Sequence, residues 1–419
     1  MEVTNSSEYN CVVVIGGGPA GMMAAGTSAN SGLKAILLEK NAILGKKLAI
    51  TGKGRCNVTN NCDVDTLIRN IPVNGKFLYS AFSLFGAQST INFFEKMKVT
   101  LKTERGNRVF PLSDKSADIV TALKRYAFHS NVQRVTGEAI SIKVEGDSIA
   151  GVFSTHGFIP CNKVVISTGG LSYPMTGSTG DGYRLSKELG HTVIPLRPSL
   201  VPLETEEVWC RKAAGLSLVN VAVRLLDTAA NKVTYFDFGE MLFTHFGVSG
   251  PVIISMSAHI KSVETGRYKI LIDLKPGLTQ EKLDSRLQRD FEKFSTKNFS
   301  NSLSLLLPRS LIPVVVSLSG IPPHTATNQI TREQRLSLIA LLKELPLTVK
   351  AFRNIEEAIV TSGGISTMEI NPRTMESKLV KGLFFAGEVI DVDAYTGGFN
   401  LQIAFSTGYT AGLSAASEV

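Results

Sequence analysis

Continuous apolar runs near both ends of the chain predict buried strands of a parallel sheet. Residues 11–15 and 35–38 form two such runs, and the small residues at 19–31 between them predict a helix. Runs without alternation are typical of strands that are covered on both faces. Residues 164–167 and 383–386 repeat this pattern. The chain therefore begins with a βαβ unit, and the parallel pattern returns at its C-terminal end.

The middle of the chain has a different pattern. Residues 219–226 and 268–274 alternate apolar and polar positions, which predicts antiparallel strands. Residues 279–294 and 332–345 carry many charges and predict helices. We therefore predict an α/β fold that is interrupted by an insertion rich in strands and helices.

Two further helices are expected in the parallel part. Residues 181–189 predict a short helix, with Asp181 as its N-cap and Gly190 just after its end. Residues 399–416 are rich in Ala, Ser and Gly and predict the last helix of the chain.

A glycine-rich motif, G-G-G-P-A-G, follows the first strand and opens the first helix. Gly16 permits the tight turn, Gly18 lets the backbone approach a pyrophosphate, and Gly21 lets helix and strand pack closely. The helix N-terminus offers N–H groups to phosphates. Glu39, at the end of the next strand, can accept hydrogen bonds from ribose hydroxyls. This combination predicts a dinucleotide site; the alternative is a glycine-rich turn without a ligand.

The C-terminal strand favours FAD over NAD as that dinucleotide. The strand ends in Glu388, whose carboxylate could bind a ribityl hydroxyl, a group that NAD lacks; Asp391 is a second candidate. Residues 397–400 then open the last helix, whose N–H groups could face the N1/C2 edge of the flavin and stabilise its reduced anion. The sequence contains no second G-x-G-x-x-G motif, so NAD(P)H is expected only as a transient reductant.

A basic loop follows Glu39. Between Lys40 and Asn60 there are five basic residues and no acid, so the loop could wrap the cofactor, with Lys46 and Lys47 on its phosphates. Arg55 would lie near the flavin or the substrate. An adjacent cation would favour the thiolate of Cys56. Cys56 is thus a candidate acid or nucleophile, while an inert buried cysteine and a solvated basic loop are the alternatives.

Two other segments stand out in the sequence. Residues 108–111, R-V-F-P, could line a pocket or form a strand edge that ends at proline. His245 lies among glycines in the insertion and could donate a proton. The alternative for His245 is a structural histidine held by hydrogen bonds.

Composition narrows the function further. The net charge of +8 indicates either a polyanionic partner such as RNA, since phosphates release counterions on binding, or simple drift in surface charge. Five cysteines without a C-x-x-C motif and six histidines without close pairing predict neither a disulfide scaffold nor a metal site. The polar residues 1–10 are not a signal peptide, and the apolar stretch 303–318 is too interrupted to span a bilayer. We therefore expect a cytoplasmic protein without a membrane partner.

Together these motifs resemble the BaiN/YhiN-like family of bacterial flavoproteins. The resemblance covers nearly the whole chain, and its G-K-G-R-C-N and L-F-T-H-F-G segments are more specific than the glycines. It is carried by I-G-G-G-P-A-G (15–21), T-G-K-G-R-C-N-V-T-N (51–60), R-V-F-P (108–111), T-G-S-T-G-D-G-Y (176–183), L-F-T-H-F-G-V-S-G-P (242–251), A-G-E-V-I-D (386–391) and G-G-F-N-L-Q (397–402).

The resemblance implies a discontinuous Rossmann-like FAD-binding domain at 1–192 and 355–419, an inserted β-barrel-like domain at 193–275 and 315–354, and a small helical domain at 276–314. The candidate catalytic residues are Cys56, His245 and Arg55. The candidate cofactor-binding residues are Gly16, Gly18, Ala20, Gly21, Glu39, Lys40, Gly45, Lys46, Lys47, Gly54, Asn57, Val135, Thr168, Gly169, Gly170, Gly387, Glu388, Asp391, Gly397, Gly398, Phe399, Asn400 and Leu401.

The expected function is that of an FAD-dependent oxidoreductase with NAD(P)H as its reductant. The resemblance implies reduction of a conjugated carbon–carbon double bond, and uridine reduction in ribosomal RNA and amine oxidation are also associated with the family. Uracil fits the first reaction because its C5=C6 bond is conjugated to C4=O, and Cys56 or His245 would protonate the α-carbon. A flavin oxidase of a small amine and a non-catalytic redox sensor are the alternatives.

Overall fold

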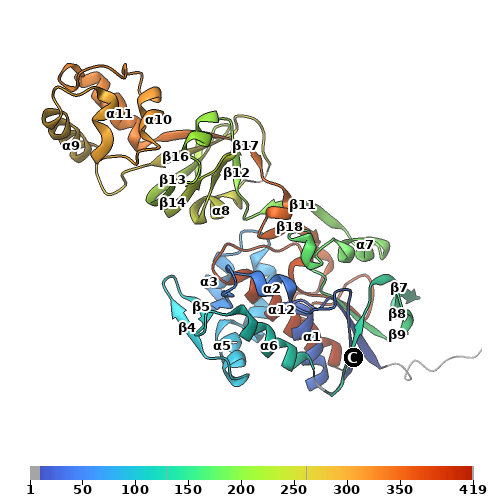
Figure 1. Cartoon of the computed structure of the whole chain (residues 1–419). Helices are drawn as coiled ribbons and strands as arrows, with labels where there is room; N and C mark the ends of the chain where they lie inside the picture. Colours follow the sequence, from blue (N-terminus) through green and yellow to red (C-terminus); the bar gives the residue numbers. More distant parts are fainter. Residues whose placement is uncertain (1–9, 129, 261, 418–419) are drawn as a thin grey trace, which may run out of the picture. The chain divides into compact units, whose positions relative to one another are not determined.

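The computed structural model describes residues 10–128, 130–260 and 262–417, and these residues form two compact units (Figure 1). The first unit combines the chain up to Ser199 with the chain from Ile355 onward, and the second unit is Leu200–Asn354. Residues 1–9, on which the expectation about a signal peptide mainly rests, lie outside the described residues. No helix in the described ranges is both long and apolar enough to cross a membrane.

A five-stranded parallel sheet forms the centre of the first unit. Four of its strands are buried along nearly their whole length, whereas the edge strand at 132–136 is largely exposed. Val14, for example, lies between Leu37 and Val165 in the ladder. The predicted parallel strands and the α/β fold class are confirmed. The strand order is β19 (Leu383–Phe385), β10 (Lys163–Ile166), β1 (Cys11–Ile15), β2 (Lys34–Glu39) and β6 (Val132–Thr136).

Two helices from opposite ends of the chain pack against each other beside this sheet. They are α1 (Pro19–Asn30) and α12 (Phe399–Ala416), so the last helix lies where the sequence predicts it. A Cβ on Gly408 would stand 2.4 Å from the carbonyl oxygen of Ala20, and a Cβ on Gly412 would stand 2.5 Å from that of Ala24. Glycines therefore allow the two helices to approach closely.

The short helix α7 (Asp181–Glu188) corrects one prediction. Gly180 is its N-cap, and Asp181 is the first helical residue rather than the cap. The physical reason is that the carboxylate of Asp181 pairs with the ammonium of Lys40 instead of a backbone N–H. Gly190, which has a φ of +85°, follows the end of the helix as predicted.

The segment between β2 and β6 contains much more structure than the predicted basic loop. Gly45, in the left-handed region at φ +71°, starts the short helix α2 (Lys46–Ile50), and Leu48 anchors that helix in the core. Helix α2 is followed by β3 (Thr59–Asn60), α3 (Val64–Arg69), α4 (Tyr79–Leu84), α5 (Ala87–Lys96), β4 (Leu101–Glu104), β5 (Arg108–Pro111) and α6 (Ser116–Ala127). The three strands form a small antiparallel sheet in the order β3-β5-β4.

Two smaller sheets complete the first unit. One is antiparallel and consists of β7 (Ala139–Glu145), β8 (Ser148–Ser154) and β9 (Gly157–Pro160). The other pairs β11 (Val193–Ser199) with β18 (Val360–Ile365). Because β11 and β18 flank the second unit in the sequence, this pairing brings the two connections together.

The second unit contains a closed six-stranded barrel with helices beyond it. The predicted strands at 219–226 and 268–274 are both barrel strands, so the inserted β-barrel is confirmed. The barrel order is β12 (Leu203–Thr205), β15 (Gly247–Ser249), β14 (Lys232–Phe243), β13 (Ser217–Asp227), β16 (Tyr268–Asp273) and β17 (Leu345–Phe352). The helices are α8 (Pro251–Ser257), α9 (Gln280–Lys293), α10 (Ile312–Leu318) and α11 (Arg332–Lys343). The predicted three-part division, at 1–192 with 355–419, at 193–275 with 315–354, and at 276–314, stays a prediction.

Candidate functional site

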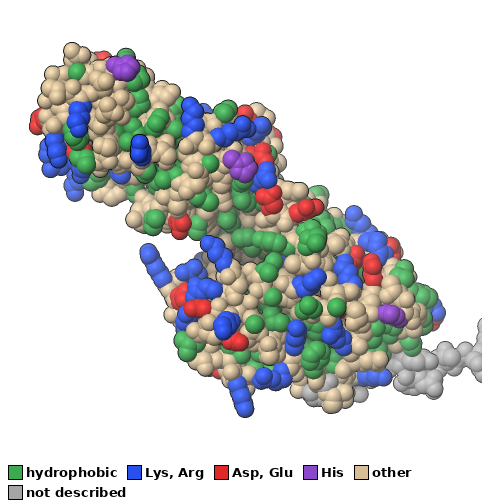
Figure 2. Space-filling view, viewed as in Figure 1, with side chains coloured by type: hydrophobic (Ala, Val, Ile, Leu, Met, Phe, Trp, Pro, Cys, Tyr) green, Lys and Arg blue, Asp and Glu red, His purple; other side chains and the backbone are tan. Residues whose placement is uncertain are grey.

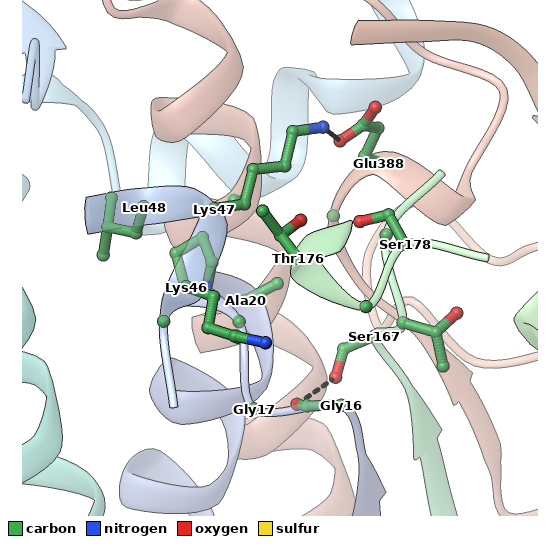
Figure 3. A pocket seen from close by; sticks show the side chains of 18 of the residues that line it. Gly16, Gly17, Ala20, Lys46, Lys47, Leu48, Ser167, Thr176, Ser178 and Glu388 are labelled. Atoms are coloured by element: carbon green, nitrogen blue, oxygen red, sulfur yellow. Dashed lines mark hydrogen bonds and ion pairs between the residues drawn. The ribbon is translucent and has the colours of Figure 1, made fainter. Parts of the chain in front are cut away.

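A deep hollow opens at the carboxyl ends of the parallel strands in the first unit (Figure 3). The empty volume inside this hollow and at its open mouth is ≈ 1340 Å³. Its wall is formed by the turn after β1, the end of β2, the residues after β10 and β19, and the first turns of α1 and α12. Open α/β sheets bind their ligands in such crevices, between strands from which the chain leaves in opposite directions.

Gly16, Gly18 and Gly21 of the glycine-rich motif are each needed for a different physical reason. Gly16 has a φ of +106°, and a Cβ there would stand 2.6 Å from the carbonyl oxygen of Ser167. A Cβ on Gly21 would stand 1.8 Å from the carbonyl oxygen of Gly16. Gly18, in contrast, has an ordinary φ of −78°, and its Cβ would meet no described heavy atom within 4 Å. The fold therefore requires glycine at positions 16 and 21, whereas Gly18 leaves an open space that a ligand can fill.

Helices α1 and α12 both begin at this hollow. Neither has an acid in its first turn, and neither receives a cap from a described side chain. Their first N–H groups are therefore available, and both helix dipoles favour negative charge in the hollow. The side chain of Asn400, in the first turn of α12, is bonded in both directions to the backbone of Ala394, which fixes the approach to this helix.

The carboxylate of Glu39 faces the glycine turn. It accepts hydrogen bonds from the backbone N–H of Gly17 at 2.6 Å and of Asn41 at 2.8 Å. The side-chain amide of Asn41 donates a third hydrogen bond at 2.7 Å. These contacts hold Glu39 at the end of β2 with its carboxylate on the wall of the hollow.

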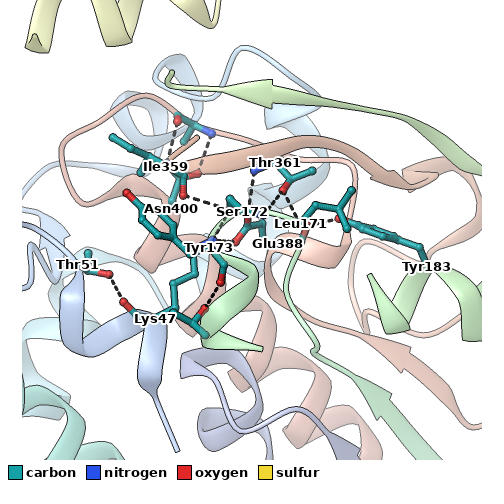
Figure 4. A network of polar contacts seen from close by, with 12 residues as sticks. Lys47, Thr51, Leu171, Ser172, Tyr173, Tyr183, Ile359, Thr361, Glu388 and Asn400 are labelled. Carbon is teal, nitrogen blue, oxygen red and sulfur yellow. Dashed lines mark hydrogen bonds and ion pairs between the residues drawn. The ribbon is translucent and has the colours of Figure 1, made fainter. Parts of the chain in front are cut away.

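A second carboxylate, that of Glu388, lies in a polar network on another part of the wall (Figure 4). It accepts hydrogen bonds from the N–H of Thr361 at 2.8 Å and from the hydroxyl of Ser172 at 3.0 Å. Lys47 forms an ion pair with it at 2.8 Å and also donates to the hydroxyl of Ser172. The ammonium of Lys47 stands 5.9 Å from the ring centre of Tyr173. Lys47 and Glu388, far apart in sequence, are thus brought together by the fold.

The other two candidate lysines point to different partners. Lys46 donates to the side-chain carbonyl of Asn41 at 3.0 Å and remains on the wall of the hollow. Lys40 forms an ion pair with Asp181 and also donates to the hydroxyl of Thr179. The positive charge of Lys40 is therefore already balanced by Asp181, whereas no acid among the described residues forms an ion pair with Lys46.

The expectation that Arg55 would favour the thiolate of Cys56 is wrong. The thiol is fully buried, and burial raises its pKa to about 12. The guanidinium of Arg55 instead pairs with Glu104 and Asp114 and lies 4.2 Å from the ring centre of Phe110. Hydrogen bonds to Arg55 and Lys102 hold the pKa of both acids below their ordinary values. The catalytic roles of Arg55 and Cys56 stay predictions.

His245 belongs to the second unit. It is exposed, its ring packs edge-on against that of Phe246, and it lines a hollow of that unit together with Glu204, Glu206 and Lys350. Within the described residues, no group of three His, Cys, Asp or Glu side chains is arranged to hold a metal ion. The role of His245 as a proton donor also stays a prediction.

Most of the predicted cofactor residues lie on the wall of the first hollow, and some lie behind it. Those on the wall are Gly16, Gly18, Ala20, Glu39, Lys40, Gly45, Lys46, Lys47, Thr168, Gly169, Gly387, Glu388, Asn400 and Leu401. The hollow's lining does not include Gly21, Gly54, Asn57, Val135, Gly170, Asp391, Gly397, Gly398 or Phe399. Among these, Asp391 is buried beside Asn74, and burial raises the pKa of its carboxyl. The segment 108–111 is strand β5 and also lies outside the lining.

Several wall residues were not predicted. They include the segment 176–178, residues 137–139 after β6, and Ile359 and Val360 at the start of β18. Ser178 in the first segment is buried, and its neighbours Gly177 and Gly180 have φ angles of +108° and +88°. Glycines spaced closely around small polar residues were the signal in the sequence that could have revealed this segment.

Comparisons with known proteins cover almost the whole chain. The family described as the HI0933-like protein Rossmann domain matches residues 10–414. The 3-dehydro-bile acid delta(4,6)-reductase of Clostridium scindens is 31% identical over 98% of this chain and 100% of its own. The ribosomal RNA dihydrouridine synthase of Escherichia coli is 29% identical over 95% of this chain and 96% of its own. The 3-ketosteroid-delta4-(5alpha)-dehydrogenase from Rhodococcus jostii has a similar fold, with a TM-score of 0.52 and 12% identity over 100% of this chain and 99% of its own.

Proposed function

Since the chain belongs to the family of HI0933-like proteins with a Rossmann domain, we propose that it is an FAD-dependent oxidoreductase that reduces a conjugated carbon–carbon double bond. This membership confirms the family resemblance carried by the sequence motifs. The relatives named above are a bile acid reductase and an RNA dihydrouridine synthase, and both names describe the addition of hydrogen to a carbon–carbon double bond.

The observation that carries the proposal is the pair of carboxylates on one hollow. Both carboxylates lie on the wall of this hollow, and we propose that Glu39 accepts from ribose hydroxyls and Glu388 from the ribityl chain that distinguishes FAD from NAD. The open space beside Gly18 and the uncapped first turn of α1 fit a pyrophosphate. The residues present therefore fit FAD.

The chemistry divides between the cofactor and the chain. FAD, when bound, supplies a hydride to the β-carbon of the substrate. The first turn of α12, which lies on the wall of the hollow, would stabilise negative charge on the bound flavin through its N–H groups and helix dipole. A proton must reach the α-carbon to complete the addition, and we keep Cys56 and His245 as the two candidate donors, with Arg55 beside Cys56 as a third catalytic candidate.

For the substrate, we propose uridine in RNA, whose C5=C6 bond is conjugated to C4=O. NAD(P)H is proposed to reduce the flavin by a transient visit, because the chain contains no second G-x-G-x-x-G motif. The proposed setting is the cytoplasm.

Anaerobic stopped-flow measurements on the purified protein test the proposal. The flavin absorbance should bleach with NADH or NADPH and recover on addition of a 3-oxo-4-ene steroid or of unmodified ribosomal RNA. Bleaching by a small amine, with peroxide formed in air, would instead show an amine oxidase. Bound FAD that neither donor class reduces would indicate a redox sensor, and a protein that takes up only nicotinamide nucleotides would refute the flavin site.

A further inference from the structure

The positive charge of the chain is concentrated in one segment of the first unit. Residues 41–131, which connect β2 to β6, contain 14 Lys and Arg against 6 Asp and Glu, a net charge of +8. The remainder of the chain contains 30 of each, so this one segment carries a charge equal to the net charge of the whole protein. Random drift in surface charge would spread the excess over the chain, whereas a polyanion-binding surface concentrates it.

Three of the six acids of this segment are already engaged, and some exposed cations of the segment have no acidic partner among the residues that the structure describes. Glu104 and Asp114 are both taken by Arg55 and Lys102. Asp63 caps helix α3. As a result, the described residues place no acid within ion-pair distance of three exposed side chains of the same region, Lys53, Arg105 and Arg108.

The backbone presents these three cations on a tight and well-anchored structure. Arg105 and Arg108 flank a turn of two residues, Gly106 and Asn107, that both have positive φ angles. Lys53 lies at the tip of the loop after α2, also in the left-handed region with a φ of +57°. Figure 2 shows Lys and Arg side chains gathered at the end of this unit where Figure 1 labels β4 and β5.

This basic surface is joined directly to the turn that begins α12. The side-chain amide of Asn60 donates to the carbonyl oxygen of Gly106 at 3.0 Å and to that of Gly397 at 3.2 Å. A Cβ on Gly398 would stand 2.4 Å from the backbone of Thr59. The β4–β5 turn and the start of α12 are therefore in contact through β3, and the first turn of α12 continues to Asn400 and Leu401 on the wall of the hollow.

We propose that Lys53, Arg105 and Arg108 bind the phosphates of single-stranded RNA on either side of the nucleotide that enters the active site. The inference rests on the proposed function, since it identifies the surface that would hold a uridine substrate. A base must leave its stack before its ring can reach a flavin, and phosphate contacts to the flanking nucleotides hold the strand while that base is turned out. Exposed cations on a rigid turn suit this task because such contacts need charge rather than base recognition.

The test measures RNA binding by the FAD-loaded protein as a function of salt. A fluorescein-labelled single-stranded RNA of about twelve nucleotides is the probe, and fluorescence anisotropy gives its affinity between 0.05 and about 0.5 M salt. The triple variant Lys53→Gln, Arg105→Gln, Arg108→Gln is compared with wild type. The control variant changes Lys34, Lys187 and Arg373 to Gln, which removes the same charge from exposed positions outside residues 41–131.

Removing three phosphate contacts should lower the slope of log affinity against log salt by about 2, since each contact contributes roughly 0.7 for a single strand. Affinity at 0.1 M salt should then fall about a hundredfold, and the control should keep the wild-type slope. Equal slopes for the two variants would overturn the proposed surface.

Reduction of a small steroid enone separates this inference from the proposed function. The triple variant should keep the flavin spectrum and the enone turnover of wild type, because none of its residues lines the cofactor hollow. Enone turnover without any RNA binding would overturn the surface and leave the flavin reductase standing. RNA binding that depends on the three cations, in a protein without flavin turnover, would support the surface and refute the reductase.

Discussion

Gly18→Ala separates what a glycine does for the fold from what it does for a ligand. Gly18 has a φ of −78°, which alanine adopts freely, and its Cβ would enter open space. The substitution should leave the fold intact. It also lowers the entropy of the unfolded chain, so the free energy of unfolding should stay equal or rise by about 0.4–1 kcal/mol.

The same methyl group should instead weaken the binding of FAD. It would occupy the space beside the first turn of α1 in which we place the pyrophosphate. A phosphate moved outward loses at least one hydrogen bond from a backbone N–H, and such bonds to charged groups contribute about 1.5–3 kcal/mol. The Kd for FAD should therefore rise roughly 10- to 150-fold.

Titration of the apoprotein with FAD, followed by flavin fluorescence, measures this loss, and circular dichroism on heating measures stability. Gly277→Ala is the matched control, since its Cβ also meets no described heavy atom within 4 Å but lies in the second unit. Gly21→Ala should show the opposite result, a lower Tm, because of the contact at 1.8 Å with the carbonyl of Gly16. If Gly18→Ala bound FAD as tightly as Gly277→Ala, the space beside Gly18 would not be the phosphate site.

Three further results are expected. Glu388→Gln should weaken FAD binding about tenfold, because its amide nitrogen cannot accept from the groups that hold the carboxylate; unchanged affinity in calorimetry would contradict this. Cys56 should resist iodoacetamide at pH 8, because burial raises its pKa to about 12 and the reactive thiolate forms only toward that pH; labelling as fast as in the unfolded protein, measured by mass spectrometry, would refute its burial. Gly412→Ala should cost about 1–3 kcal/mol, since its Cβ would stand 2.5 Å from the carbonyl of Ala24; an unchanged Tm would show that α1 and α12 are not closely packed.

The parts of the fold that the sequence predicts are those with a strong local pattern. The apolar runs of β1 and β2 and the alternating residues of β13 and β16 each identify their strand without knowledge of its partner. The sheet β3-β5-β4 was not predicted, because β3 has only two residues and pairs with a strand far along the chain. A strand of two residues is too short to show an alternation of apolar and polar positions. Its pairing therefore depends on tertiary contacts.

The same distinction applies to the site. Glycines and acids at strand ends can be recognised because each performs a local task that its spacing reveals. The ion pair of Lys47 with Glu388 joins positions 341 residues apart, and no local pattern contains it. Each residue was predicted for the site separately, whereas the network that orients both comes only from the folded chain.

Sequence neighbours can also mislead, as Arg55 and Cys56 show. Cys56 lies in the left-handed region at φ +60°, with its thiol buried, while the side chain of Arg55 extends to Glu104 and Asp114. Burial therefore decides the protonation of the thiol, and the adjacent cation does not lower its pKa. An efficient proton donor has a pKa near the working pH, and a pKa of about 12 makes Cys56 a poor donor at pH 7. Of the two proposed donors, the exposed His245 is therefore the one that burial does not argue against.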